Sequence, residues 1–278
     1  MFLDAVLNDA MRTFGGVFAG LVLFRVVELA LPQRGVEPPQ RHLFGAKVWL
    51  AYLCIQVALT AVLLNVMDSS GASPQVDPRD VLGLPTWAAG IVVAVSVLLV
   101  KDFFFYWQHR GEHRWLWRWH ASHHSIRNLS ASNSWHHWSE IIIFAIFVSL
   151  PLSLLSPAFG PRPYIVGLLL LWHPIYIHSS TRLQLHPWVR RVVIDSRFHR
   201  IHHSLEPRHF DRNFGSVTPL WDWLFGTMYM PRGDEWPEVG LAGIDEPESL
   251  RQWSAQPWRL KSGAPHEAEP VELTADPA

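Results

Sequence analysis

The sequence predicts an all-α integral membrane protein, with about four to five hydrophobic helices or hairpins and a cytoplasmic helical cap that holds a histidine-rich dimetal site. Three observations lead to this fold class. Long apolar runs recur along the chain, only 17% of the residues are charged, and most of the 16 histidines fall in short boxes. Soluble domains ordinarily carry about 25% charged residues, so the low charge favours a membrane protein.

The apolar runs are long enough to cross a bilayer. Residues 48–67 contain no charge, and a helix of about 20 residues spans a hydrocarbon core of roughly 30 Å. Residues 87–100 predict a second span. Residues 13–31, which lack the basic start and cleavage site of a signal peptide, predict a third. The shorter runs 141–155 and 164–177 predict a hairpin that crosses the membrane, or dips partway and returns.

Loop charges predict the orientation. The 32–47 loop is basic, the 68–83 loop is mainly acidic, and the histidine segments are rich in arginine. Because Lys and Arg accumulate on the cytoplasmic side, all three histidine boxes are expected there, and counting the spans gives the same side. The composition is compatible with a bacterial inner-membrane protein.

The order of these features predicts three parts. The N-terminal transmembrane helices comprise 1–94, the histidine-box catalytic domain 95–230, and a polar C-terminal tail 231–278. Within the tail, 249–260 reads as a short surface helix, whereas 261–278 is rich in Pro, Ala and Glu and is expected to be disordered.

Composition excludes several other classes. A net charge of −1 offers no electrostatic surface for nucleic acid. The single cysteine, Cys54, excludes internal disulfides and a cysteine-based zinc finger.

The histidines carry the functional signal. Fourteen of them lie between His109 and His209, and eight form the boxes HRGEH (109–113), HASHH (120–124) and HRIHH (199–203). Neutral imidazole is the commonest protein ligand for transition metals. If residues 102–124 form one helix, the histidines of the first two boxes share an arc of about 100° with Asp102. The third box forms a second stripe, and two facing stripes would surround more than one metal ion.

Three metal chemistries remain open at this point. A zinc hydrolase needs about three ligands, a metal transporter would place histidines along a pore, and an oxygen-activating iron site uses several imidazoles. Eight histidines exceed one tetrahedral zinc and suit two metals. Glu112 is misplaced for a zincin HExxH motif, and no GxSxG elbow supports a serine hydrolase.

Three segments together resemble the fatty acid hydroxylase/sterol desaturase superfamily. Residues 102–125, DFFFYWQHRGEHRWLWRWHASHHS, look like its first two histidine boxes, and RFHRIHHS at 197–204 looks like its last. The stretch DRNFGSVTPLWDWLFGTMY at 211–229 resembles the segment that follows. The resemblance covers about residues 95–230.

This resemblance implies a non-haem di-iron monooxygenase or desaturase of lipid metabolism. Such enzymes bind two iron ions and use dioxygen as co-substrate to oxidise a C–H bond of a membrane lipid: a fatty acyl chain, a sterol, a carotenoid or an ether lipid. Electrons would come from a separate donor of the ferredoxin or cytochrome type. Zinc is an alternative occupant of the isolated protein, because it binds such sites strongly. Hydroxylation or desaturation, the substrate and the oligomeric state stay open.

The resemblance also implies a set of ligands. It assigns the metal to His109, His113, His120, His123, His124, His178, His199, His202 and His203. Two further candidates are His173, five residues before His178, and His137, which with Glu140 resembles a family HPxE element that has Trp138 in place of proline. The side chains expected to hold imidazole N–H groups are Asp102, Asp195, Asp211 and Asn213. His136 is a weaker ligand candidate than His137. The remaining histidines are interpreted as surface or structural residues: His42, His186, His209 and His266.

The main alternative is a histidine-rich metal-binding membrane protein or metal transporter without oxygenase activity. A transporter predicts histidines at mid-membrane depth, whereas here they cluster beyond the spans. A degenerate family member that binds metal without turnover is a further alternative, although all three boxes are intact.

Overall fold

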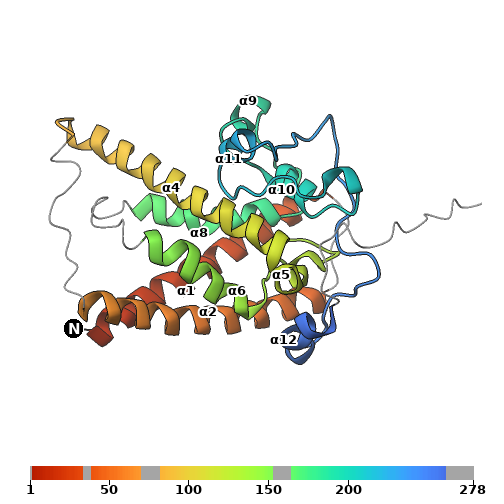
Figure 1. Cartoon of the computed structure of the whole chain (residues 1–278), viewed down its shortest axis with the longest axis horizontal. Coiled ribbons are helices and arrows are strands. Elements are labelled where there is room, and N and C mark those ends of the chain that lie inside the picture. Colours follow the sequence, from red (N-terminus) through yellow and green to blue (C-terminus); the bar gives the residue numbers. More distant parts are fainter. Residues whose placement is uncertain (1, 34–38, 70–81, 153–163, 261–278) are drawn as a thin grey trace, which may run out of the picture.

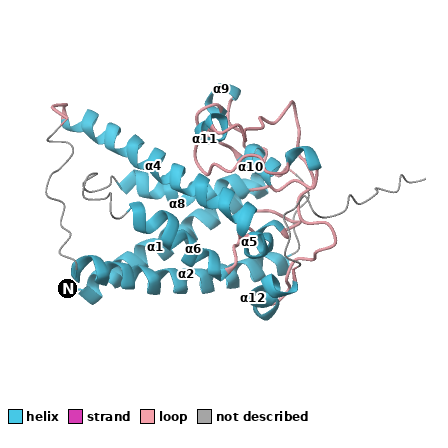
Figure 2. Cartoon of the chain, viewed as in Figure 1, coloured by secondary structure: helices cyan, strands magenta, loops and turns pink. Residues whose placement is uncertain are grey.

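The structure is a computed structural model that describes residues 2–33, 39–69, 82–152 and 164–260. Within those ranges it is helical, and its only β-pairing consists of isolated bridges. Four long helices run along the length of the molecule (Figure 1; Figure 2). They are α1 (Phe2–Ala30), α2 (Pro39–Ser69), α4 (Thr86–Trp115) and α8 (Tyr164–His178). The described part therefore has the predicted all-α architecture.

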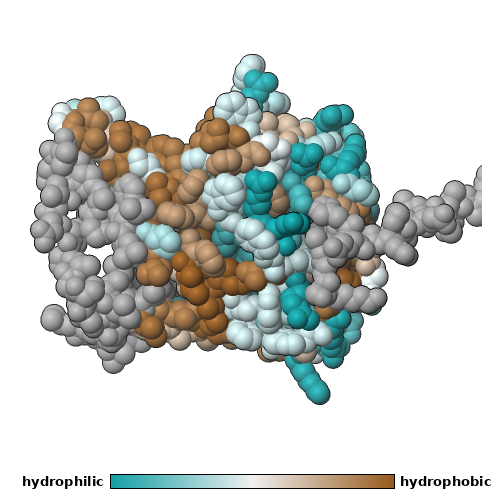
Figure 3. Space-filling model, viewed as in Figure 1, coloured by the Kyte–Doolittle hydropathy of each residue, from teal (hydrophilic) through white to brown (hydrophobic). Residues whose placement is uncertain are grey.

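Three of these helices are long and apolar enough to cross a membrane. The candidate spans are Ala10–Ala30, Arg41–Leu59 and Thr86–Trp115, and a shorter apolar helix covers Trp138–Leu152. Large apolar side chains point outward along them, among them Phe18, Leu50 and Ile91. Figure 3 shows a hydrophobic band over this part of the molecule and a hydrophilic surface at the opposite end, where the short helices lie. The chain is an integral membrane protein.

Short helices build the polar end and the second half of the bundle. They are α5 (Trp117–His124), α6 (Trp138–Phe144) with the π-helix η1 (Ala145–Ser149), α9 (Pro187–Arg190), α10 (Ser196–His202), η2 (Pro207–His209), α11 (Leu220–Leu224) and α12 (Leu250–Arg259). The helix expected at 249–260 is α12. The connection of the predicted hairpin, 153–163, and the predicted disordered tail, 261–278, lie outside the described residues.

The continuous helix assumed for residues 102–124 is wrong. α4 ends at Trp115, Leu116 adopts φ −119° and ψ 21°, and α5 starts at Trp117. Because the backbone leaves helical geometry at Leu116, α5 turns back onto α4. The histidines of the first two boxes therefore meet across a helix–turn–helix and do not share one stripe.

A buried segment between α5 and α6 is held against α1 and α2. Glu28 of α1 accepts hydrogen bonds from the backbone amides of Ala131 (2.8 Å) and Ser180 (2.9 Å). A Cβ atom at Gly45 of α2 would overlap the carbonyl oxygen of Ser132, so the absence of a side chain permits the close approach. The apolar contacts that complete this junction join Phe44, Val48, Ile126, Leu129, Trp135, Val239 and Trp253.

Candidate metal centre

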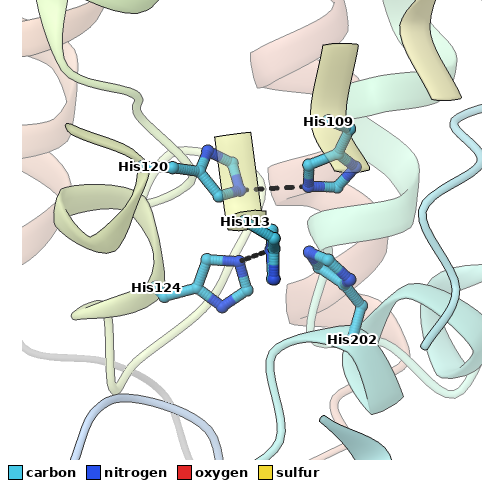
Figure 4. Close-up of side chains that lie close together, drawn as sticks. All are labelled: His109, His113, His120, His124 and His202. Atoms are coloured by element: carbon cyan, nitrogen blue, oxygen red, sulfur yellow. Dashed lines mark hydrogen bonds between the residues drawn. The ribbon is translucent and has the colours of Figure 1, made fainter. Parts of the chain in front are cut away.

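Five buried histidines form a first group at the polar end of α4. Their ligand nitrogens lie within 4.8 Å of one another, and they are His109, His113, His120, His124 and His202. Figure 4 shows these rings facing a common centre from α4, α5 and α10. The Nε2 atoms of His109 and His120 are 3.0 Å apart, and those of His113 and His124 are 3.1 Å apart.

Four more buried histidines form a second group beside the first. These are His123, His178, His199 and His203, again with ligand nitrogens within 4.8 Å of one another. The Nε2 atom of His178 lies 3.1 Å from that of His123 and 3.0 Å from that of His199. The rings of His124 and His203 stack at 4.4 Å, so the two groups are in contact.

Two helices contribute to both groups. α5 carries His120 and His124 of the first group and His123 of the second. α10 and its C-cap carry His202 of the first group and His199 and His203 of the second. In each HxxHH box, neighbouring residues point to different centres because a helix turns about 100° per residue.

The nitrogen separations fit ligands that share one metal ion. Two nitrogens bound at about 2.1 Å lie roughly 3.0 Å apart at a right angle and roughly 3.4 Å apart at a tetrahedral angle. The Nε2 pairs within the two groups are 3.0–3.2 Å apart. Without a metal, lone pairs at these separations would repel wherever neither nitrogen carries a proton. Nine imidazoles in two adjoining groups therefore have the composition and spacing of residues that could hold metal.

Hydrogen bonds on the outer nitrogens orient the rings. An Nδ1–H that donates to a carbonyl leaves the Nε2 lone pair free for a metal. The Nδ1 atom faces a backbone carbonyl in four of the histidines: His109 to Phe214 (2.9 Å), His123 to Trp135 (2.9 Å), His178 to Pro174 (2.6 Å) and His202 to Arg212 (2.8 Å).

The ring of His202 also indicates that the first group is suited to a metal ion. Its Nε2 atom is buried and has no hydrogen-bond partner in the protein, although its Nδ1 atom is bonded. A buried polar atom without a partner is costly, and a metal in the first group would satisfy it. Burial also lowers the pKa of His202 to about 3, so its imidazole is neutral and able to bind metal at physiological pH.

Two of the proposed additional ligands lie outside both groups. The two ring nitrogens of His173 face the backbone carbonyls of Ser216 (2.9 Å) and Ile194 (3.1 Å). His137 caps α6 through Ser139, and its Nε2 atom faces the carbonyl of Ser254 at 3.2 Å. The ring nitrogens of both residues therefore contact protein atoms and not the other histidines.

Of the four residues expected to hold imidazole N–H groups, the structure places only Asp211 on a histidine. Its Oδ1 atom is 3.3 Å from Nδ1 of His113. Asp102 instead accepts four hydrogen bonds from the loop 216–218, and Asp195 caps α10 and pairs with Arg190. Asn213, at φ 62°, bonds the backbone of Phe198 and Tyr229. These three position backbone segments near the histidines.

The structure places His136 beside both histidine groups, whereas His209 lies apart from them. His136 stacks on His123 at 3.8 Å, and its Nδ1 atom is 2.9 Å from Oε2 of Glu140. That same oxygen is 2.8 Å from Nδ1 of His120. His209 is fully buried and structural, with Ser204 and Glu235 beside it. The HPxE-like element at 137–140 drew attention to Glu140. No motif spacing predicts the position of His136, because it depends on tertiary packing against His123.

A cavity of about 190 Å³ adjoins both histidine groups. Its walls come from α2, α4, α5, α6 and α8 and include His109 and His120 of the first group and His123, His178 and His199 of the second. Away from the histidines it is lined mainly by apolar side chains: Trp49, Tyr52, Phe105, Trp135, Phe144, Leu170, Pro174 and Ile177. Small-molecule sites have this character, with apolar walls and a few placed polar groups.

Fold and site together define a membrane-embedded helical protein with a buried polyhistidine centre. The fatty acid hydroxylase family model matches residues 94–227. The chain is 29% identical over 180 residues to ornithine lipid hydroxylase OlsE of Rhizobium tropici, covering 63% of this chain and 53% of that protein. It is 33% identical over 137 residues to human alkylglycerol monooxygenase, covering 48% of this chain and 29% of that protein.

A third relative is the fatty acid hydroxylase vlmA of Lecanicillium, 30% identical over 172 residues, which cover 55% of this chain and 47% of that protein. No solved structure matches the chain. Residues 94–227 of the chain therefore form a segment of the fatty acid hydroxylase superfamily. The matched part spans about half of the bacterial relative and less than a third of the human one.

Proposed function

We propose that this chain is a membrane-bound, non-haem di-iron oxygenase that uses dioxygen to hydroxylate or desaturate a lipid. The observation that carries the proposal is the junction of an apolar cavity with two converging groups of buried imidazoles. The relatives named for ornithine lipid, alkylglycerol and fatty acid substrates all act on molecules with long alkyl chains.

Each set of residues has a distinct part in this function. The first group, His109, His113, His120, His124 and His202, would hold one iron, and the second group, His123, His178, His199 and His203, would hold the other. When bound, the irons supply the reduction of dioxygen by two external electrons and the oxidation of a C–H bond. The apolar walls hold the alkyl chain against the histidines and exclude water.

The arrangement disfavours a metal transporter. A transport pathway needs ligands distributed along the membrane normal, whereas all nine histidines lie in two adjoining groups. Five of them are drawn in Figure 4. On the positive-inside rule we place the histidine groups on the cytoplasmic side, where a separate ferredoxin or cytochrome donor has access to them. We retain the division into 1–94, 95–230 and 231–278 as the domain organisation that serves this function.

The decisive experiment compares metal and turnover in three proteins purified in detergent after growth with iron. They are the wild type, the double variant His123→Ala/His202→Ala, with one ligand removed from each group, and the control His186→Ala, which alters an exposed histidine that caps α9. We expect about two irons per chain in the wild type and the control and loss of iron in the double variant. With a reducing partner, only the first two should oxidise an alkyl lipid.

Two results would contradict the proposal. One is a wild type that takes up no iron under these conditions. The other is iron content that stays unchanged in the double variant, which would mean that the two groups do not hold it. Vesicle uptake of metal by the wild type without lipid oxidation would favour the transporter instead.

A further inference from the structure

A polar stripe runs along the cavity face of α4. Lys101, Phe105, Gln108 and Glu112 all line the cavity, and their spacing of three and four residues puts them on one side of the helix. Three of the four are polar and nearly buried, with exposures of 7%, 8% and 2% for Lys101, Gln108 and Glu112. Polar side chains inside a membrane span are expensive and are retained for function.

Gln108 and Glu112 leave hydrogen-bond acceptors unused. Nε2 of Gln108 donates to Oε1 of Glu112 at 3.0 Å, which fixes the amide so that its oxygen faces elsewhere. That oxygen, Oε1 of Gln108, is buried and has no partner. The other carboxylate oxygen of Glu112 lies 3.7 Å from Nδ1 of His120, which is already bonded to Glu140 at 2.8 Å. Oε1 of Gln108 therefore lacks a donor, whereas Oε2 of Glu112 lies 3.7 Å from His120.

Lys101 differs from Gln108, because its side chain is hydrogen-bonded within the protein whereas Oε1 of Gln108 has no partner. Lys101 donates to Oγ of Ser216 at 3.0 Å, and Ser216 in turn donates to Asp102 at 2.9 Å. A buried acceptor without a donor costs free energy. Two other buried atoms of the described cavity lining have no protein partner: Nε1 of Trp49, which is a donor, and Nδ1 of His199.

We propose that the lipid substrate carries a hydrogen-bond donor, a hydroxyl or an amide N–H, and that Gln108 and Glu112 accept it. This inference rests on the proposed function and names the substrate class for that site. Glu112 lies between the ligands His109 and His113 on α4, so a donor bound there brings the adjoining carbon up to the first histidine group. Gln108 and Glu112 are then specificity-determining residues that favour a functionalised lipid over a plain alkyl chain.

The test measures binding, which does not depend on turnover. Detergent-purified protein is mixed with equal amounts of N-hexyl hexadecanamide and deuterated hexyl hexadecanoate, which have the same chain but differ in the N–H group. Native mass spectrometry then gives the ratio of the two complexes. A parallel competition uses a secondary long-chain alcohol and its deuterated methyl ether, which separates hydroxyl from amide as the source of the donor.

We expect the wild type to prefer the amide, the alcohol or both by roughly threefold to tenfold over the partner that lacks the donor, as one hydrogen bond to a neutral amide oxygen would give. Gln108→Met, which keeps the side-chain volume, and Glu112→Met should bring the ratio close to one while the ester still binds. The control Phe144→Leu alters an apolar wall and should keep the preference.

Equal binding within both pairs by the wild type would overturn the proposal. So would a preference that survives in both methionine variants, with ester binding as the measure of an intact cavity. Failure of the proposed function can be told apart from failure of this inference. A protein without iron or without lipid oxidation would contradict the proposed function, but the ratio of the two complexes could still be measured.

Discussion

The carboxylate of Glu140 joins two imidazoles and the start of a helix. Its Oε2 atom contacts Nδ1 of His120 and of His136, and its Oε1 atom accepts the backbone amide of His137 at 3.0 Å. His120 belongs to the first histidine group, and His136 stacks on His123 of the second. One carboxylate therefore orients rings at both proposed metal positions.

We expect Glu140→Gln to weaken metal binding by about 10- to 100-fold, as is usual when an outer partner of a ligating histidine is lost. The affinity is measured by competition with a chelator. Glu248→Gln serves as the control, because Glu248 is exposed and belongs to none of the candidate metal groups of the described residues. Equal affinities for the two variants would show that Glu140 does not orient the ligands.

Burial also predicts how the metal-free protein responds to acid. It lowers the pKa of His199 and His203 well below the usual value and that of His202 to about 3. In the unfolded chain these imidazoles take up protons near pH 6.5, so the unfolded state binds more protons and stability falls as the pH drops from about 6.5 towards 3. Chelator-treated protein should lose thermal stability between pH 7 and pH 5, and an unchanged melting temperature would contradict this.

At this scale the sequence predicted which histidines lie together better than it predicted the groups that surround them. The nine principal histidines that the resemblance implied all lie in the two groups, because box spacing restricts which faces of a helix they occupy. The partners of their Nδ1 atoms are mostly backbone carbonyls, which no residue type in the sequence reveals. His173 looked like a ligand by type, but its ring closes a contact between two loops.

Among the elements, the loop at 214–218 matters because the carbonyl of Phe214 orients His109. Asp102 of α4 accepts hydrogen bonds from the amides of Ser216, Val217 and Thr218 at 2.9–3.0 Å. A Cβ atom at Gly215 would lie 2.6 Å from the carbonyl oxygen of Thr218, so only glycine fits this turn.

We expect Asp102→Asn to destabilise the protein by about 1–3 kcal/mol, because an amide NH₂ would face a backbone N–H that now has an acceptor. Thermal unfolding in detergent measures the change. Asp234→Asn, at an exposed position beyond this loop, should leave the midpoint unchanged. A similar midpoint for the two variants would count against a structural role of Asp102.

The long helices were predictable and the break between α4 and α5 was not. Apolar runs of 20 residues or so identify spans by length alone, and all three candidate spans overlap the predicted ones. The break at Leu116 carries neither Gly nor Pro. It is set by tertiary contacts, since α5 packs against both α4 and α12, and such contacts override local helix propensity.

For the whole molecule, the orientation in the membrane is open to direct labelling. In a Cys54→Ser background we expect Arg208→Cys, at the histidine end, to react with a membrane-impermeant maleimide only after cell lysis. Leu82→Cys, before α4 at the other end of the spans, should react in intact cells. Both positions are exposed. The reverse pattern would put the histidine groups outside the cytoplasm and contradict the positive-inside assignment.

The sharing of α5 and α10 between the two histidine groups bears on how the protein matures. If either helix became ordered by binding a metal ion in one group, the histidine rings that it contributes to the other group would become ordered too. Binding of the first ion would include the free-energy cost of ordering both helices. The second ion would then bind more tightly because its ligands are already arranged, which is positive cooperativity. A partly supplied cell would then contain a mixture of fully loaded and empty molecules, and its iron supply would control the number of active enzymes and not the activity of each one.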